Sequence, residues 1–435
     1  MDDAFGSVAD SGGAPEGGDE PGRSEYLVIL SVVLSVFFLG FSGGVIFPIL
    51  PNLGAVLGIS PFVVGLILGI NRFARILSNV PAGLVTDRIG TRTPFVGGLV
   101  VQAIGTFGYV IGYSAPRPGV WFLASRLTIG IGGGFMFATV FTIAGDLSGS
   151  DSRGRVMGLL RGGLFSGLPV GLVIGGLVAD VADGVAGLPG NLVALLLASG
   201  FSVVAVALAY VTVPETHVDD ERTGPVGVRT VDRSLTTVTI GFVNFAVQFA
   251  YVGVLFATLV QYLRTADIGA FGLSAQGSSG VFIAVTFLVG SVCMFSGGYL
   301  SDIRASRLPT LFAFICSLSA GFAVLVVSES VGLVALACVL IGVGKGGIDG
   351  PLSALLADLT PDDRLGRASG TNNVLTDLGA GIGPVVAVPL VEDVGFGPLY
   401  ATSALLPFLA GGLLLAGLRY ETGACLPNTA DIDVS

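Results

Sequence analysis

Lys345 and Asp349 stand four residues apart in the stretch GVGKGGIDG, directly after the apolar run VGLVALACVLI. Residues at this spacing share one face of a helix, so the ammonium and the carboxylate can form an ion pair. An ionised side chain inside a membrane costs roughly 2.5–3.5 kcal/mol on insertion scales, which makes each such residue a candidate for function. The pair is therefore a candidate for substrate binding or proton coupling. The alternative is a structural ion pair near a helix bend.

Other polar residues in apolar stretches form a second group of candidates. Asn244, Gln248 and Tyr251 follow the helical spacing i, i+4 and i+7. They share one helical face, which favours the lining of a cavity over contact with lipid. Asp377 is a lone acid in an apolar stretch and is a candidate for protonation. Four arginines also fall in apolar stretches: Arg72, Arg75, Arg126 and Arg161. For arginines of this kind, pairing with acids or with helix carbonyls is the structural alternative.

Two short patterns suggest enzyme chemistry but lack its context. A G-x-G-x-x-G pattern begins at Gly342, yet a dinucleotide-binding turn needs a soluble strand–turn–helix unit around it. A Walker loop is excluded because Gly346, not Ser or Thr, follows Lys345. GFSGG at 40–44 lies in an apolar helix, and the single histidine, His217, lies in a polar stretch. We expect no cofactor, metal site or enzymatic activity, and we expect the glycines to let helices pack closely.

The composition is typical of a protein with many membrane-spanning helices. Hydrophobic residues make up 52% of the chain and charged residues 11%, with a mean hydropathy of +0.88. A soluble domain carries about 25% charged residues. The formal net charge of −10 argues against nucleic-acid binding. The excess of acids, with Lys345 as the only lysine, is typical of a salt-adapted, haloarchaeal proteome.

The candidates above must be positioned by helices that cross a bilayer, each of which needs roughly 20 apolar residues. Twelve such spans are predicted at 26–50, 61–85, 94–114, 118–147, 154–180, 188–213, 235–263, 275–300, 308–328, 331–357, 366–391 and 396–418. The predicted fold is thus all-α, with two six-helix bundles over 26–213 and 235–418. The remaining segments are a disordered acidic tail, a cytoplasmic linker and a C-terminal tail, at 1–25, 214–234 and 419–435.

The distribution of basic residues predicts the orientation. With the N-terminus inside, thirteen basic residues fall in inner segments and only Arg117 and Arg264 fall in outer loops. We therefore expect both termini on the cytoplasmic side of the cell membrane.

The halves are also internal repeats, since a shift of 212 residues brings Gly130 onto Gly342 in one register that continues for some fifty residues. Duplicated halves of this kind are typical of two-bundle transporters.

The stretch GLVTDRIGTR resembles the loop 2–3 signature of the major facilitator superfamily. The matching residues are Gly83, Asp87, Arg88, Gly90 and Arg92. The resemblance extends from Tyr26 to about Arg419, although Thr93 replaces a second basic residue. It implies that Asp87 latches the first half to span 11 when the inner gate is shut, and that Gly83 allows the close approach. The alternative is that Arg88 and Arg92 serve only the topology.

RLTIGIGGG resembles the span-4 motif and implies a coupling role for Arg126.

The fifth span resembles the antiporter motif of the same family. Its glycines are Gly158, Gly167, Gly171, Gly175 and Gly176, whereas Leu172 replaces the proline of the motif. This resemblance implies the branch of proton-coupled drug and multidrug antiporters, which are exporters.

We therefore expect a monomeric secondary transporter that exports a small drug-like or amphipathic molecule, with the proton as coupling ion and sodium as the alternative. A proton- or sodium-coupled uptake permease is the nearest alternative. From another class, a receptor-like sensor or a membrane-embedded enzyme could use the same fold. The sensor hypothesis lacks an output domain, and the enzyme hypothesis lacks a motif.

Overall fold

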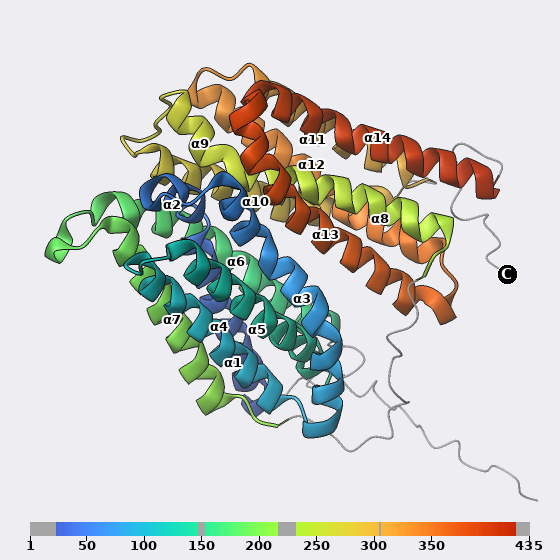
Figure 1. Cartoon of the computed structure of the whole chain (residues 1–435). Helices are drawn as coiled ribbons and strands as arrows, with labels where there is room; N and C mark the ends of the chain where they lie inside the picture. Colours follow the sequence, from blue (N-terminus) through green and yellow to red (C-terminus); the bar gives the residue numbers. More distant parts are fainter. Residues whose placement is uncertain (1–22, 147–152, 216–231, 304–305, 423–435) are drawn as a thin grey trace, which may run out of the picture.

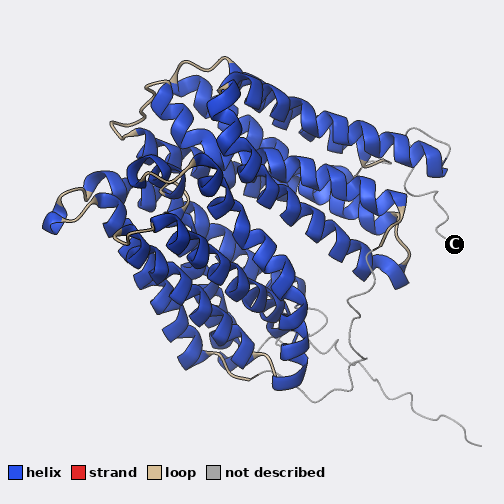
Figure 2. Cartoon of the chain, viewed as in Figure 1, coloured by secondary structure: helices blue, strands red, loops and turns tan. Residues whose placement is uncertain are grey.

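The computed structural model describes residues 23–146, 153–215, 232–303 and 306–422, and within these ranges all regular elements are helices (Figures 1 and 2). The helices of the first half are α1 (Arg23–Ile46), α2 (Leu50–Leu57), α3 (Pro61–Ile89), α4 (Arg92–Tyr113), α5 (Pro118–Asp146), α6 (Arg153–Val181), the 3₁₀ turn η1 (Val185–Gly187) and α7 (Gly190–Thr212). Those of the second half are α8 (Leu235–Gln248), the π-helix η2 (Phe249–Phe256), α9 (Ala257–Thr265), α10 (Ala275–Asp302), α11 (Leu308–Val326), α12 (Val331–Asp358), α13 (Asp362–Val394) and α14 (Phe396–Thr422).

The predicted all-α membrane fold is confirmed. Each predicted span overlaps one long helix or, for 235–263, the continuous run from α8 to α9, and the span 26–50 extends beyond the end of α1 into the turn before α2. In the described ranges, eleven helical runs are long and apolar enough to cross a membrane. Helix α6 contains a shorter apolar stretch over Ser166–Val181. Helix α13 begins four residues before the predicted start, where Pro361 stands at the N-cap and two aspartates occupy the first turn. Acidic residues favour a helix N-terminus.

Glycines bring α6 close to α1. A Cβ atom at Gly167 would clash with the carbonyl oxygen of Phe37, and one at Gly171 would clash with that of Phe41. Gly175 meets the backbone of Val45 in the same way. Small residues at such regular spacing let two membrane helices approach backbone to backbone. Three glycines of the antiporter motif therefore have a packing function. The other two differ, since Gly176 faces α10 and a Cβ at Gly158 would meet nothing within 4 Å.

The glycines around Lys345 also serve packing. A Cβ at Gly346 would clash with the backbone of Gly290 on α10, and one at Gly344 would clash with Leu318 on α11. They let α12 pack closely against two neighbours, as expected from the sequence, and no strand precedes them as a dinucleotide fold would need.

The two halves meet along two seams, α3 with α13 and α6 with α10. At the first seam, a Cβ at Gly69 would clash with the carbonyl oxygen of Gly381. Figure 1 shows that the halves are close at the end that carries α2 and α9, which we call the closed end. The helices diverge toward the opposite end, where α3 ends and α13 begins, and which we call the linker end.

Candidate substrate and coupling site

A cavity of about 320 Å³ lies between the halves and is lined by residues of both. Five of the predicted candidates line it: Gln248, Tyr251, Lys345, Asp349 and Asp377. Arg72 and Arg75 of α3 complete its charged surface. The rest of the wall is mostly apolar. A concave, largely apolar site with a few polar groups is the usual form of a small-molecule site, and this volume falls within the common range.

The predicted pair on α12 is an ion pair in the structure. The Nζ atom of Lys345 lies 2.6 Å from Oδ1 of Asp349. The two side chains are 12% and 35% exposed, so the lysine is well buried and the carboxylate opens into the cavity. The arrangement holds an ionisable acid beside its counter-charge, at a place that a ligand can reach.

Asp377 joins the two halves at the centre of the molecule. Its carboxylate accepts hydrogen bonds from Nε and Nη2 of Arg75, the former at 3.2 Å, and Nη1 of Arg72 lies 3.5 Å away. The side chain of Asp377 is only 10% exposed, so the bidentate pair satisfies a carboxylate that would be costly alone. The predicted lone acid of span 11 therefore has two arginine partners on α3.

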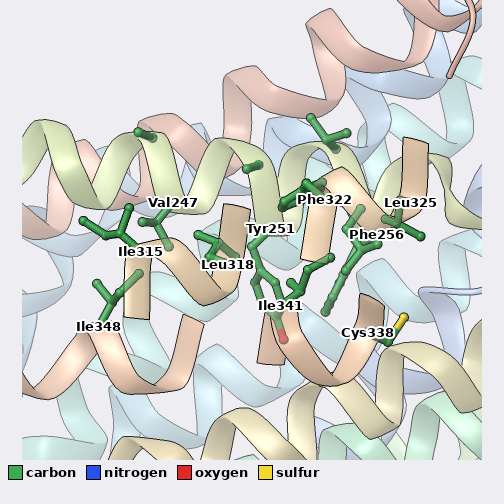
Figure 3. Close-up of a cluster of buried hydrophobic side chains, with 14 of the residues drawn as sticks. Val247, Tyr251, Phe256, Ile315, Leu318, Phe322, Leu325, Cys338, Ile341 and Ile348 are labelled. Carbon is green, nitrogen blue, oxygen red and sulfur yellow. The ribbon is translucent and has the colours of Figure 1, made fainter. Parts of the chain in front are cut away.

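The polar stripe of span 7 divides between two environments. Tyr251 packs against Phe256, with ring centroids 4.8 Å apart, and Figure 3 shows both in a cluster with Ile341 and Cys338. Asn244, in contrast, does not line the cavity, which corrects the prediction. Its amide donates to Oδ1 of Asn372 on α13 at 2.8 Å. Its face of α8 is covered by α13, where an amide–amide hydrogen bond satisfies both groups.

Arg126 lies behind the cavity wall. The residue is 4% exposed, and its Cζ atom lies 5.5 Å from the centre of the Phe47 ring, which lines the cavity. The Nε and Nη2 atoms are buried and have no hydrogen-bond partner among the described residues. The resemblance implied a coupling role for this arginine, and the structure places it one aromatic ring away from the site.

The loop 2–3 residues lie at the linker end. Asp87 and Arg88 are exposed, and a Cβ atom at Gly83 would meet nothing within 4 Å. Gly90 ends α3 with φ of 86°, a conformation that glycine adopts at least cost. Arg92 donates to the backbone oxygen of Tyr210 at 2.9 Å. The signature is thus fixed to its own half at Arg92, while Asp87 stands free of the tight approach to span 11 that the resemblance implies for a shut gate.

Sequence reasoning did not find the polar contacts that join the halves at the closed end. The amide of Asn52 donates to Gln276 and its oxygen accepts from Arg264. The backbone nitrogen of Ser274 donates to Asp180 at 2.9 Å. The available signal was weak: Arg264 is one of only two basic residues in the predicted outer loops.

Comparisons with known proteins agree with this architecture. The family model described as Major Facilitator Superfamily matches residues 32–384. The chain belongs to the major facilitator superfamily. This is a family of multi-pass membrane proteins that act as secondary transporters of small molecules, and its members are not enzymes, as the sequence predicted.

Individual relatives are more distant. The inner membrane transport protein YajR of Escherichia coli (strain K12) is 28% identical over 141 residues, which cover 32% of this chain and 29% of that relative. A bacterial homologue of the human lysosomal transporter Spinster, solved in an inward-facing and occupied conformation, matches with a TM-score of 0.72 and 17% identity, over 92% of this chain and 98% of that one. The human organic anion transporter MFSD10 matches with a TM-score of 0.63 and 20% identity, over 90% and 99%. At these identities the solved structures support the fold alone.

Proposed function

We propose that the chain is a proton-coupled exporter of small amphipathic or drug-like molecules that works by alternating access. The main observation that supports this proposal is the cavity between the halves. It contains two acids, Asp349 and Asp377, each held by a basic partner, and both acids face the same volume. Protonation of either acid weakens its ion pair, so proton binding and the arrangement of the cavity wall are linked.

We further propose that the closed end faces the exterior and the linker end the cytoplasm of the cell. The contacts of Asn52 then form the outer gate, and the structure is inward-facing. The basic residues of the linker end support this orientation. Two solved Spinster homologue structures described as inward-facing share the fold. The acidic, lysine-poor composition supports a salt-adapted source, and the similarity to YajR, an inner membrane transport protein, supports the cytoplasmic membrane.

Coupling is best tested in proteoliposomes. A thermal-shift screen of small molecules on the purified chain selects a substrate, and its movement is then followed under imposed pH or sodium gradients. We expect transport out of the compartment that faces the linker end, driven by a proton gradient of opposite direction. Transport driven only by sodium, or movement of substrate and proton in the same direction, would favour the uptake permease.

The variant Asp349→Asn tests whether Asp349 is the acid that couples transport to the proton gradient. It keeps the size of the side chain but cannot exchange a proton, so we expect gradient-driven transport to fall at least tenfold while substrate exchange without a gradient continues. Arg117→Gln, at an exposed residue of the closed end, serves as the control and should leave both rates unchanged. Unaltered dependence on the pH gradient in Asp349→Asn would rule out Asp349 as the coupling acid.

A further inference from the structure

The fixed charges around the cavity do not balance. The lining contains three cations and two anions: Arg72, Arg75, Lys345, Asp349 and Asp377. Arg126, whose Cζ atom lies 5.5 Å from the centre of the Phe47 ring, adds a fourth cation. The described groups at the centre of the molecule therefore carry a net charge of plus two when all are ionised. In a low-dielectric site an excess of this kind attracts anions and repels cations.

Arg126 shows where the missing negative charge fits. Arg75 is bidentate to Asp377, but the guanidinium of Arg126 has neither an acid nor a hydrogen-bond acceptor among the described residues. Its two buried, unpartnered atoms are Nε and Nη2. These atoms form one edge of the guanidinium plane, the edge that binds a carboxylate or phosphate through two parallel hydrogen bonds. A buried charge without a partner is strongly unfavourable, so this edge is suited to a ligand.

The neighbourhood of Arg126 specifies the rest of the ligand. Phe47, whose ring covers the guanidinium, also lines the cavity together with Phe256 and Phe287. A cation over an aromatic face is stabilised only partly, so an anionic group can displace the ring. Arg72, whose contact to Asp377 is as long as 3.5 Å, also lines the cavity and can give a second positive contact.

We infer that the substrate is an organic anion: a carboxylate or phosphate group binds the Nε–Nη2 edge of Arg126, and an apolar body lies among the phenylalanines. This inference rests on the proposed transport function for its meaning, but it concerns binding and can be tested without a gradient. It restricts the proposed amphipathic substrates to those with a negative charge.

Three probes with the same apolar body test the sign of charge: 2-naphthylacetate, the neutral 2-naphthylacetamide and the cationic 2-(2-naphthyl)ethylamine. Their binding to the purified full chain is measured at low salt by thermal shift and by isothermal titration. We expect the carboxylate to bind at least tenfold more tightly than the amide, and the amine to bind least. Equal binding of the three, binding of the amine alone, or binding of none would overturn the inference.

Variants of Arg126 locate the site. Arg126→Gln should reduce the affinity for the carboxylate at least tenfold and leave the affinity for the amide within twofold, whereas Arg126→Lys should be intermediate because it keeps the charge but loses the fork. Arg117→Gln is the matched control and should bind all probes like the unchanged chain. Without ligand, Arg126→Gln should melt at the same or a higher temperature, because it removes a charge that lacks a partner. A lower melting temperature without ligand would identify a structural arginine and overturn the inference.

A preference for the carboxylate without any gradient-driven movement would uphold the anion site and contradict only the proposed export.

Discussion

At the scale of single residues, the ion pair of Lys345 and Asp349 can be tested by a double-mutant cycle. Each single change to alanine leaves one charge without its partner in a poorly solvated wall. We expect each to cost about 1–3 kcal/mol of stability, less than for a fully buried pair because Asp349 is 35% exposed. The double change to alanine should cost less than the sum of the two, since no lone charge remains. Melting temperatures of the four proteins measure the coupling, and strictly additive losses would argue against an energetic pair.

At the scale of elements, the approach of α6 to α1 depends on glycines that have no room for a methyl group. Gly171→Ala should lower stability by about 1–3 kcal/mol, because its Cβ would meet the backbone of Phe41 and the two helices would have to move apart. Gly158→Ala lies on the same helix, where the added atom meets nothing within 4 Å. It should be neutral or stabilising by up to about 1 kcal/mol, as expected for alanine in a helix. Thermal unfolding in detergent compares the two, and equal effects would remove the packing explanation of the antiporter motif.

At the scale of the whole molecule, Asp87 is exposed although the resemblance implies a latch. We propose that it engages only when the linker end closes. Asp87→Asn should then leave the stability of the present conformation unchanged but remove most transport, because the closed linker end loses a charged contact. A cysteine at position 291, on the cavity wall, reports the state through its rate of alkylation in a background without the native cysteines.

The expected rate of alkylation in Asp87→Asn equals or exceeds that of the parent. Asn52→Ala removes the side chain that bridges Arg264 and Gln276 at the closed end. It should therefore lower the rate of alkylation at position 291. Normal transport by Asp87→Asn would reduce Asp87 to a marker of topology.

Sequence alone predicts contacts within one helix better than contacts between helices that are distant in the chain. The contact of Lys345 with Asp349 is local, so helical spacing was sufficient to predict it. The partners of Asp377 lie 302 and 305 residues away, and no local pattern could indicate them. Asn244 shows the limit of periodicity, which identified a polar face but not that α13 covers part of it. Which end is closed also escapes the sequence, because the two conformations of a transporter differ by only a few kcal/mol.

Lys345 is the only lysine of the chain. Apart from the N-terminal amine, an acylating reagent has a single amine to attack, and that amine lies in the cavity wall beside Asp349. The hydrogen bonds from this amine to Asp349 should slow acylation, and Asp349→Asn should accelerate it severalfold. A small activated ester, with the product located by mass spectrometry after proteolysis, would therefore report on the cavity of the unchanged chain. A substrate that fills the cavity should protect the same amine.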